Sequence, residues 1–179
     1  MEERRIAIYL TNLGKYVESC LVYELVKLPI DKEKLQDVLD HIGIDGQQYE
    51  EVFISDYETS LSNLHISEYA SIQELNELAR KIDELADFDY DKLGAVLECE
   101  GNTSIAEVLE LIDQLDNFDL LTEVDTDEAL GEYYADCGCI FYGVPDHIQR
   151  YFDFEAYGRD IRLESNITMT SYGAVIDNR

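Results

Sequence analysis

The chain is poor in positive charge and in tryptophan and proline, and it contains no long apolar run. Its 179 residues include 13 Lys and Arg against 40 Asp and Glu, a formal net charge of −27, with no Trp and two Pro. Nucleic acids and anionic lipids are bound mainly through Lys and Arg, so direct DNA binding is not expected. No segment approaches the roughly 18 apolar residues of a membrane span, and the N-terminus lacks a signal-peptide pattern. We expect a cytoplasmic protein.

Cysteine and histidine are too sparse to indicate a metal or redox centre. The four cysteines are too few and too scattered for a disulfide framework, and the C-x-C pair lacks the two-residue spacer of zinc sites, so we expect reduced thiols. The three histidines are isolated from one another and from any nucleophile motif. The cysteines are Cys20, Cys99, Cys137 and Cys139, and the histidines are His41, His65 and His147.

Catalysis has no support in the sequence. Neither Gly-rich phosphate-binding motif occurs, and with 40 acids no particular carboxylate pair is specific for general acid–base chemistry. We therefore expect a protein that is not an enzyme and that needs no cofactor.

The negative charge is concentrated in the middle of the chain. Between Lys92 and Arg150 lie 14 acids and no base. With 46% hydrophobic residues and 13 Tyr, the chain should nevertheless fold. Acids recur every three residues from Glu107 to Asp119, whereas an ordinary solvated helix face interleaves Lys with Glu because like charges at this spacing repel. The alternative to a solvated face is a surface that a basic cleft reads as phosphates.

The hydrophobic pattern predicts an α+β fold made of an elongated protomer with three small domains. In residues 1–70, strands near Ile6–Asn12, Cys20–Leu28 and Glu51–Tyr57 surround a helix capped by Asp31, which indicates a unit with an antiparallel sheet. Residues 71–117 form the predicted central helical domain, because Ser71/Glu74 and Ser104/Glu107 are capping boxes.

Residues 118–179 form the predicted C-terminal α+β domain. A short strand over Phe118–Val124 precedes a helix over about Asp127–Cys137. Pro145 suits the first turn of another helix, which carries Ile148, Tyr151 and Phe152. Strands at Ile167–Thr170 and Ala174–Ile176 flank a turn, which indicates a terminal hairpin.

One segment resembles a calcium loop. Asp87, Asp89, Asp91 and Glu98 stand at positions 1, 3, 5 and 12 of an EF-hand, but Lys92 occupies the position that requires Gly. An acidic calcium-binding or adaptor module is therefore the alternative function, and caps on a short helix near Lys92–Glu98 are the simpler explanation.

The size of the charge fits DNA mimicry. Duplex DNA carries one charge per about 1.7 Å of axis, so 27 charges correspond to roughly 45 Å of duplex. An acidic protein of this kind could occupy a DNA-binding groove.

Several strings along the chain resemble the ArdA antirestriction family, in matching order and spacing. They are Tyr9–Glu18 (YLTNLGKYVE), Leu28–Asp31 (LPID), Asp56–Glu58 (DYE), Glu68–Asn76 (EYASIQELN), Val144–Pro145 (VP) and Tyr151–Asp160 (YFDFEAYGRD). The resemblance implies a DNA mimic, carried by conjugative plasmids or transposons, that binds type I restriction-modification enzymes and blocks their access to DNA. It also implies a homodimer formed through the C-terminal domain.

Ten acids are the expected contacts with the enzyme. The resemblance places Glu123, Asp125 and Asp136 at acidic positions of the family, with three more acids in the same segment, and the three-residue recurrence supplies the rest. The full set is Glu107, Glu110, Asp113, Asp116, Glu123, Asp125, Asp127, Glu128, Glu132 and Asp136.

Overall fold

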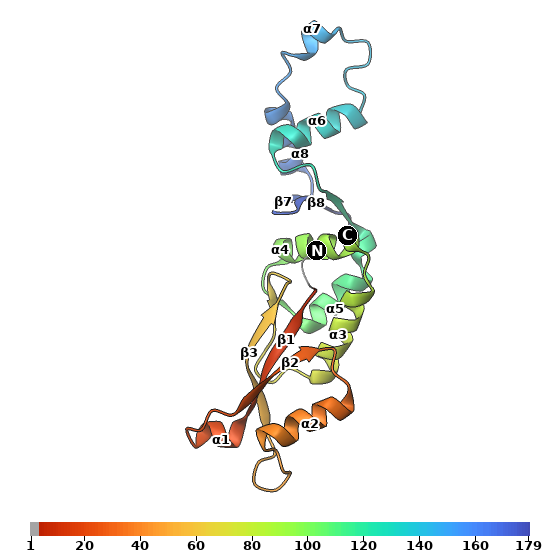
Figure 1. Ribbon diagram of the computed structural model, residues 1–179. Helices are drawn as coiled ribbons and strands as arrows, with labels where there is room; N and C mark the ends of the chain where they lie inside the picture. The colour runs from red at the N-terminus through yellow and green to blue at the C-terminus, as the bar shows by residue number, and fades with distance from the viewer. Residues whose placement is uncertain (1–3) are drawn as a thin grey trace. The chain divides into compact units, whose positions relative to one another are not determined.

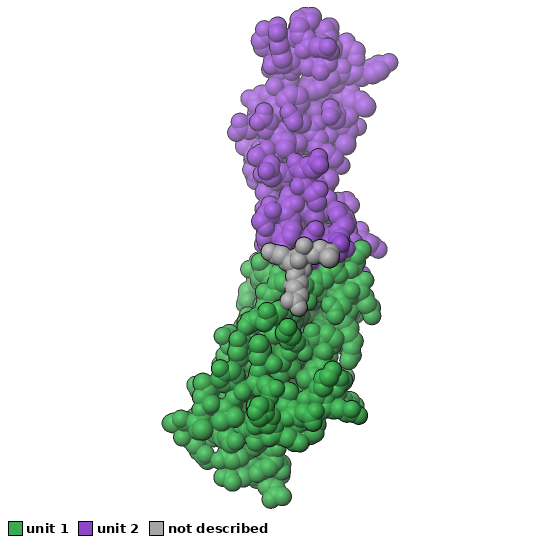
Figure 2. Space-filling model, viewed as in Figure 1, with its two compact units in different colours: residues 1–86, 102–112 green, residues 87–101, 113–179 purple. Residues whose placement is uncertain are grey.

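The computed structural model describes residues 4–179 and divides into two compact units (Figures 1 and 2). Unit 1 comprises Met1–Ala86 and Asn102–Ile112, and unit 2 comprises Asp87–Gly101 and Asp113–Arg179. The chain is 46% helical and 22% strand, with antiparallel sheets in separate N- and C-terminal regions, which confirms the α+β class. The division into three domains stays a prediction.

Unit 1 is built on a three-stranded antiparallel sheet in the order β2-β1-β3. Six of the seven residues of the central strand β1 are buried and Tyr9 is half-buried, so this strand is covered on both faces. The predicted order of strand, strand, helix, strand is found with one addition, a short helix over Leu13–Val17 between the first two strands. The strands are β1 (Ile6–Asn12), β2 (Tyr23–Leu28) and β3 (Val52–Thr59).

Side-chain caps fix the start of the helices of unit 1. Asp31 Oδ1 accepts a hydrogen bond of 2.9 Å from the Lys34 amide, and Ser71 Oγ accepts one of 3.4 Å from the Glu74 amide. Gly43, at φ 83°, ends the first of these helices in the left-handed region that glycine adopts without strain. The helices are α1 (Leu13–Val17), α2 (Lys32–Ile42), α3 (Ile72–Glu84) and α5 (Ile105–Asp113), and the parallel bridge β4 (Leu64–His65) to β5 (Thr103–Ser104) precedes α5.

Unit 2 contains a second antiparallel sheet, in the order β6-β8-β7. Leu120 lies opposite Val175 and Leu121 lies opposite Ala174, so the two pairs face opposite sides of the sheet. Leu121 and Ala174 belong to a core with Val124 that also receives side chains from helices α6 and α8. The strands are β6 (Phe118–Leu121), β7 (Ile167–Thr170) and β8 (Gly173–Asp177), which confirms the C-terminal hairpin.

Two glycines let the helices of unit 2 pack backbone against backbone. A Cβ at Gly131 of α6 would collide with the Phe154 carbonyl, and one at Gly158 of α8 would collide with the Asp127 carbonyl. The helices of unit 2 are α4 (Asp87–Glu100), the 3-10 turn η1 (Leu115–Asn117), α6 (Asp127–Cys137), α7 (Asp146–Gln149) and α8 (Phe154–Glu164).

Two helix predictions need correction. Helix α4 begins five residues before Lys92, at Asp87, and the acids Asp87 and Asp89 in its first turn are favoured by the helix dipole. The helix after Pro145 ends at Gln149, so Phe152 lies beyond it and joins a cluster of edge-to-face rings with Phe141 and Phe154.

Candidate functional site

The cations of unit 2 are largely engaged inside the unit. Unit 2 has 20 Asp and Glu against five Lys and Arg. Lys92 is 9% exposed, and its Nζ donates to the carbonyls of Leu115 and Phe118 at 3.2 and 3.3 Å. Because this ammonium holds α4 to the turn η1 and to the first residue of β6, its charge is not displayed to a partner.

Arg179 is also neutralised by its own neighbours. Its guanidinium donates to Glu100 at 2.6 Å and to Asp177 at 2.8 Å, and it lies 4.6 Å from the centre of the Phe118 ring. These hydrogen bonds raise the pKa of Arg179 and lower that of Asp177. Of the remaining cations, Arg162 is bound internally as described below, and Arg150 and Arg159 lie at the surface.

Asp127, one of the ten expected contacts, turns its carboxylate inward. Arg162 Nε donates to Oδ1 at 2.6 Å and Nη2 donates to Oδ2 at 2.9 Å, a bidentate pair between α6 and α8. The hydrogen bonds from Arg162 lower the pKa of Asp127. The pairing joins residues 35 apart in sequence, and Asp127 therefore acts in the structure as a link between two helices.

The other acids of α6 form a stripe on its exposed face. Glu128, Glu132 and Asp136 are four residues apart, which on an α-helix places them along one side at about 6 Å intervals. Leu130, about 160° around the helix from the centre of this stripe, is fully buried. The apolar side thus fixes the rotation of the helix and directs the three carboxylates to solvent.

Two further acids immediately precede this helix. Glu123 and Asp125 are exposed, and the Val124 side chain between them is buried, so successive side chains point alternately to solvent and to the core. Thr126 then caps α6 by accepting from the Ala129 amide at 3.1 Å. We call Glu123, Asp125, Glu128, Glu132 and Asp136 the α6 acidic surface. Within residues 4–179, none of these five carboxylates has an ion pair or a side-chain hydrogen bond.

The four expected contacts nearer the N-terminus lie in other elements. Glu107 and Glu110 belong to α5 and to unit 1, Asp113 ends α5, and Asp116 lies in the 3-10 turn η1. The acids that recur every three residues therefore do not form one helical stripe. The structure brings together six of the ten acids in the segment 123–136.

Glu107 also has a structural task. Its carboxylate accepts from the Ser104 amide at 2.8 Å and from the Ser104 hydroxyl at 2.6 Å, which closes the predicted capping box. These two hydrogen bonds lower the pKa of Glu107. The group stays anionic and exposed, and it fixes the start of α5.

The residues that resemble an EF-hand are helical. Asp87, Asp89 and Asp91 lie within α4, where alternate residues point about 200° apart and cannot converge on one ion. Among the described residues no group of three or more His, Cys, Asp and Glu has the geometry for a metal ion. The EF-hand interpretation is therefore wrong.

The acids of the α6 stripe are more widely spaced than the phosphates of one DNA strand. One strand of duplex DNA has a charge about every 3.4 Å of axis, whereas the α6 stripe has one about every 6 Å. A single helix thus supplies about half the charge density of one strand. The neighbouring acids at residues 123 and 125 raise this density at the start of the helix.

Comparison with known families identifies the chain. A family model described as antirestriction protein (ArdA) matches residues 8–176. The chain belongs to the ArdA family. This membership implies an antirestriction function and interaction with restriction enzymes. A search of curated proteins found no match.

The ArdA match spans both units, so the acidic segments of both belong to the family region. No helix in the described part of this ArdA chain is long and apolar enough to cross a membrane.

Proposed function

We propose that this ArdA protein is a DNA mimic that occupies the DNA-binding groove of a type I restriction-modification enzyme. The observation that carries the proposal is the α6 acidic surface. Its five exposed carboxylates have no ion pair within residues 4–179, whereas three of the five cations of the same unit are bound internally. The Lys and Arg side chains of the enzyme that normally neutralise DNA phosphates would bind these carboxylates instead. The protein acts by occupancy and not by catalysis, and it works in the cytoplasm beside its target.

The proposal includes Glu107, Glu110, Asp113 and Asp116 as further contacts in the groove. Each exposed charge pair contributes about 0–1 kcal/mol, so affinity comes from many carboxylates together. Asp127 is the exception among the ten, because Arg162 already holds it. We expect Asp127 to act by positioning α6.

Charge reversal on the stripe tests the mimicry. The triple variant Glu128→Lys, Glu132→Lys, Asp136→Lys should lose about 2–4 kcal/mol of binding, some 30- to 1,000-fold in Kd, because three attractions become repulsions. The assay is competition with duplex DNA for a purified type I methyltransferase, at several salt concentrations. Binding of the parent protein should weaken steeply as salt rises.

A matched control separates the site from the net charge. The variant Glu33→Lys, Glu77→Lys, Asp83→Lys changes the charge equally on exposed helix positions of unit 1. It should reduce the affinity far less than the stripe variant. Equal losses would show that bulk charge alone determines binding, and unchanged DNA binding at saturating inhibitor would contradict the proposal.

The segment between α6 and α8 supports the proposed homodimer. Tyr142 is 94% and Tyr151 is 76% exposed, and Ile148 is also exposed, beside the ring cluster of Phe141 and Phe152. Aromatic residues exposed together are typical of subunit interfaces. A second copy of the chain would cover them.

Sedimentation measures the proposed dimer. The double variant Tyr142→Ser, Tyr151→Ser should dissociate at concentrations where the parent is dimeric. Tyr69→Ser is the control, because Tyr69 is 70% exposed but lies in unit 1. If the double variant sediments like the parent, this segment is not the interface.

A further inference from the structure

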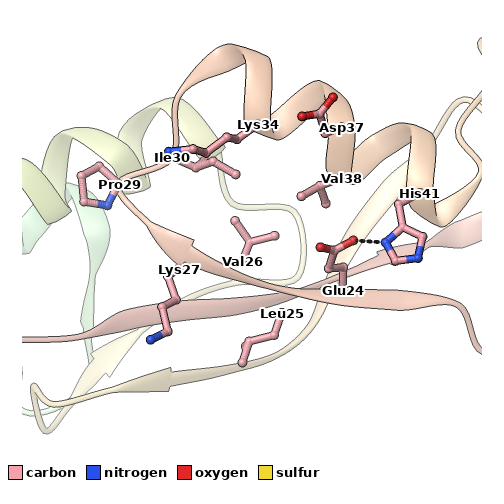
Figure 3. A pocket seen from close by; sticks show the side chains of 10 residues that line it. All are labelled: Glu24, Leu25, Val26, Lys27, Pro29, Ile30, Lys34, Asp37, Val38 and His41. Carbon is pink, nitrogen blue, oxygen red and sulfur yellow. Dashed lines mark hydrogen bonds and ion pairs between the residues drawn. The ribbon is translucent and has the colours of Figure 1, made fainter.

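Unit 1 contains a groove between β2 and α2 that the antirestriction function does not explain. Its volume is about 560 Å³, within the range of ligand sites. Figure 3 shows Val26, Ile30 and Val38 directed into it from the strand, the connection and the helix. Glu24 and His41 close one end, with 2.6 Å between Glu24 Oε2 and His41 Nδ1.

In the part of the chain that the structure describes, no strand pairs with the strand side of this groove, which is therefore a free sheet edge. β2 is the outer strand of the order β2-β1-β3. The Asn12 amide donates to the Val22 carbonyl at 3.0 Å, so Asn12 and Val22 are a hydrogen-bonded pair, and pairs of this kind recur every second residue along an antiparallel ladder. Val26, opposite Ile8, therefore bonds to β1, whereas Leu25 and Lys27 direct their N–H and C=O groups outward.

Leu25 and Lys27 also line the groove. Their side chains turn away from α2, on the opposite side of the strand from Val26 (Figure 3). A row of outward N–H and C=O groups at strand spacing is complementary to another extended chain, because only a strand presents matching groups at the same repeat.

Hydrogen bonds hold the helix side of the groove in place at both ends. The Ile30 amide donates to Asn76 Oδ1 at 2.8 Å, and Asn76 Nδ2 donates to the Ile30 carbonyl at 3.0 Å. At the other end Asn12 Nδ2 and Lys15 Nζ donate to the Ile42 carbonyl at 3.1 and 3.2 Å. The groove is thus formed before any occupant enters, which lowers the cost of binding.

The local charge differs from that of the rest of the chain. Lys27 and Lys34 line the groove together with Glu24 and Asp37, so its lining is balanced in charge although the chain carries −27, and Lys34 is already in an ion pair. Lys27 and Lys32 are exposed and have no ion pair within residues 4–179. The charge of Lys27 therefore favours an occupant with acidic side chains on the same side of β2 as the Lys27 side chain.

We propose that the groove binds an extended segment of a partner protein, which adds a fourth strand to the sheet at β2. In this segment alternate residues are apolar and acidic. The apolar side chains enter the space between Val26 and Val38, and the acidic ones face Lys27 on the other side of the strand. This partner is distinct in charge from the basic groove of a restriction enzyme.

A proline at the free edge tests the pairing. Lys27→Pro removes the outward N–H and leaves the ladder between β1 and β2 intact, because this N–H takes no part in it. Lys27→Ala is the matched control, since it removes the same charge and keeps the N–H. The probe is an eight-residue peptide of alternating Val and Asp, titrated into the ¹⁵N-labelled full chain and followed by NMR.

The expected result is saturable shifts of the Leu25 and Lys27 amides, with slowed hydrogen exchange at both. Lys27→Pro should weaken binding more than tenfold and Lys27→Ala less than about fivefold, the value of one exposed charge. Slow exchange of the Val26 amide in Lys27→Pro shows that the sheet is intact, and an N-methylated peptide provides the same test without a variant.

Two results would overturn the proposal. One is the absence of saturable shifts at the β2 edge with the Val–Asp peptide. The other is an alternating Val–Lys peptide that binds as tightly as the Val–Asp peptide, which would show that the groove does not select acidic side chains. Neither result bears on the antirestriction function, which the competition assay measures separately.

Discussion

Replacing Gly158 by alanine should destabilise unit 2, although alanine is the better helix former. Gly158 lies within α8, where it packs against the backbone of α6. In an exposed helix the substitution would stabilise the protein by about 1 kcal/mol. The close approach of the two helices reverses this sign.

The geometry gives the magnitude. A Cβ at position 158 would lie 2.5 Å from the Gly131 amide nitrogen and closer still to the Asp127 carbonyl, whereas ordinary contacts are 3.4–4 Å. Both neighbours are backbone atoms, so no side-chain rotation relieves the clash and the helices must separate by about 1 Å. Overpacking of this kind costs about 1–3 kcal/mol and sometimes more. The separation also stretches the bidentate pair of Asp127 with Arg162, so we expect a net loss of about 1–3 kcal/mol.

Urea unfolding followed by circular dichroism measures this loss. The controls are Asp160→Ala and Asp160→Gly at an exposed position of the same helix, which should differ by about 1 kcal/mol in favour of Ala. If Gly158→Ala is as stable as the parent, or more stable, the close packing of α6 and α8 is refuted. The same variant should also weaken inhibition, because α8 holds the helix that presents the α6 acidic surface.

Three further predictions concern charge and capping. In a double-mutant cycle, Arg162→Gln and Asp127→Asn should couple by about 1–2 kcal/mol at pH 7. Since the pKa of Asp127 is lowered in the folded state, this coupling is fully present above about pH 4 and is lost as pH falls through the folded pKa. Urea titrations of the four proteins at several pH values measure the coupling. A coupling that does not change with pH would contradict the prediction. Ser104→Ala should cost about 0.5–2 kcal/mol and raise the pKa of Glu107, as measured by NMR titration, and an unchanged pKa would disprove the capping box. The Tm should rise between 10 and 150 mM NaCl, because the Debye length falls from about 30 to about 8 Å and self-repulsion is screened; a falling Tm in calorimetry would argue against strong repulsion.

Much of the fold was predictable because the signals are local. Asp31, Ser71 and Ser104 each cap a helix through a group three residues away, so the sequence alone reveals the contact. The strand Ile6–Asn12 and the helix Asp127–Cys137 were predicted with the bounds that the structure has. In both segments, the structure that the local sequence favours is also the one that the tertiary environment requires.

The candidate site was predictable in composition but not in arrangement. The spacing from Glu107 to Asp116 suggested one continuous stripe, but the helix ends at Asp113, and the last acid lies in a 3-10 turn. Nothing near Asp127 in sequence indicates that Arg162 will hold it. Such pairs depend on how helices cross, and the two glycines at the α6–α8 contact set that crossing.

The sequence by itself determined the excess of negative charge, the helix caps and the family. These properties reside in composition or in residues a few positions apart. The tertiary structure decided which charges stay exposed. It buries Lys92, pairs Asp127 with Arg162 and Arg179 with Glu100, and leaves Glu128 and Glu132 in solvent. It also decided which edge of β2 is free. The physical reason is that ion pairs, burial and strand order join residues far apart in the chain, and no local periodicity encodes those contacts.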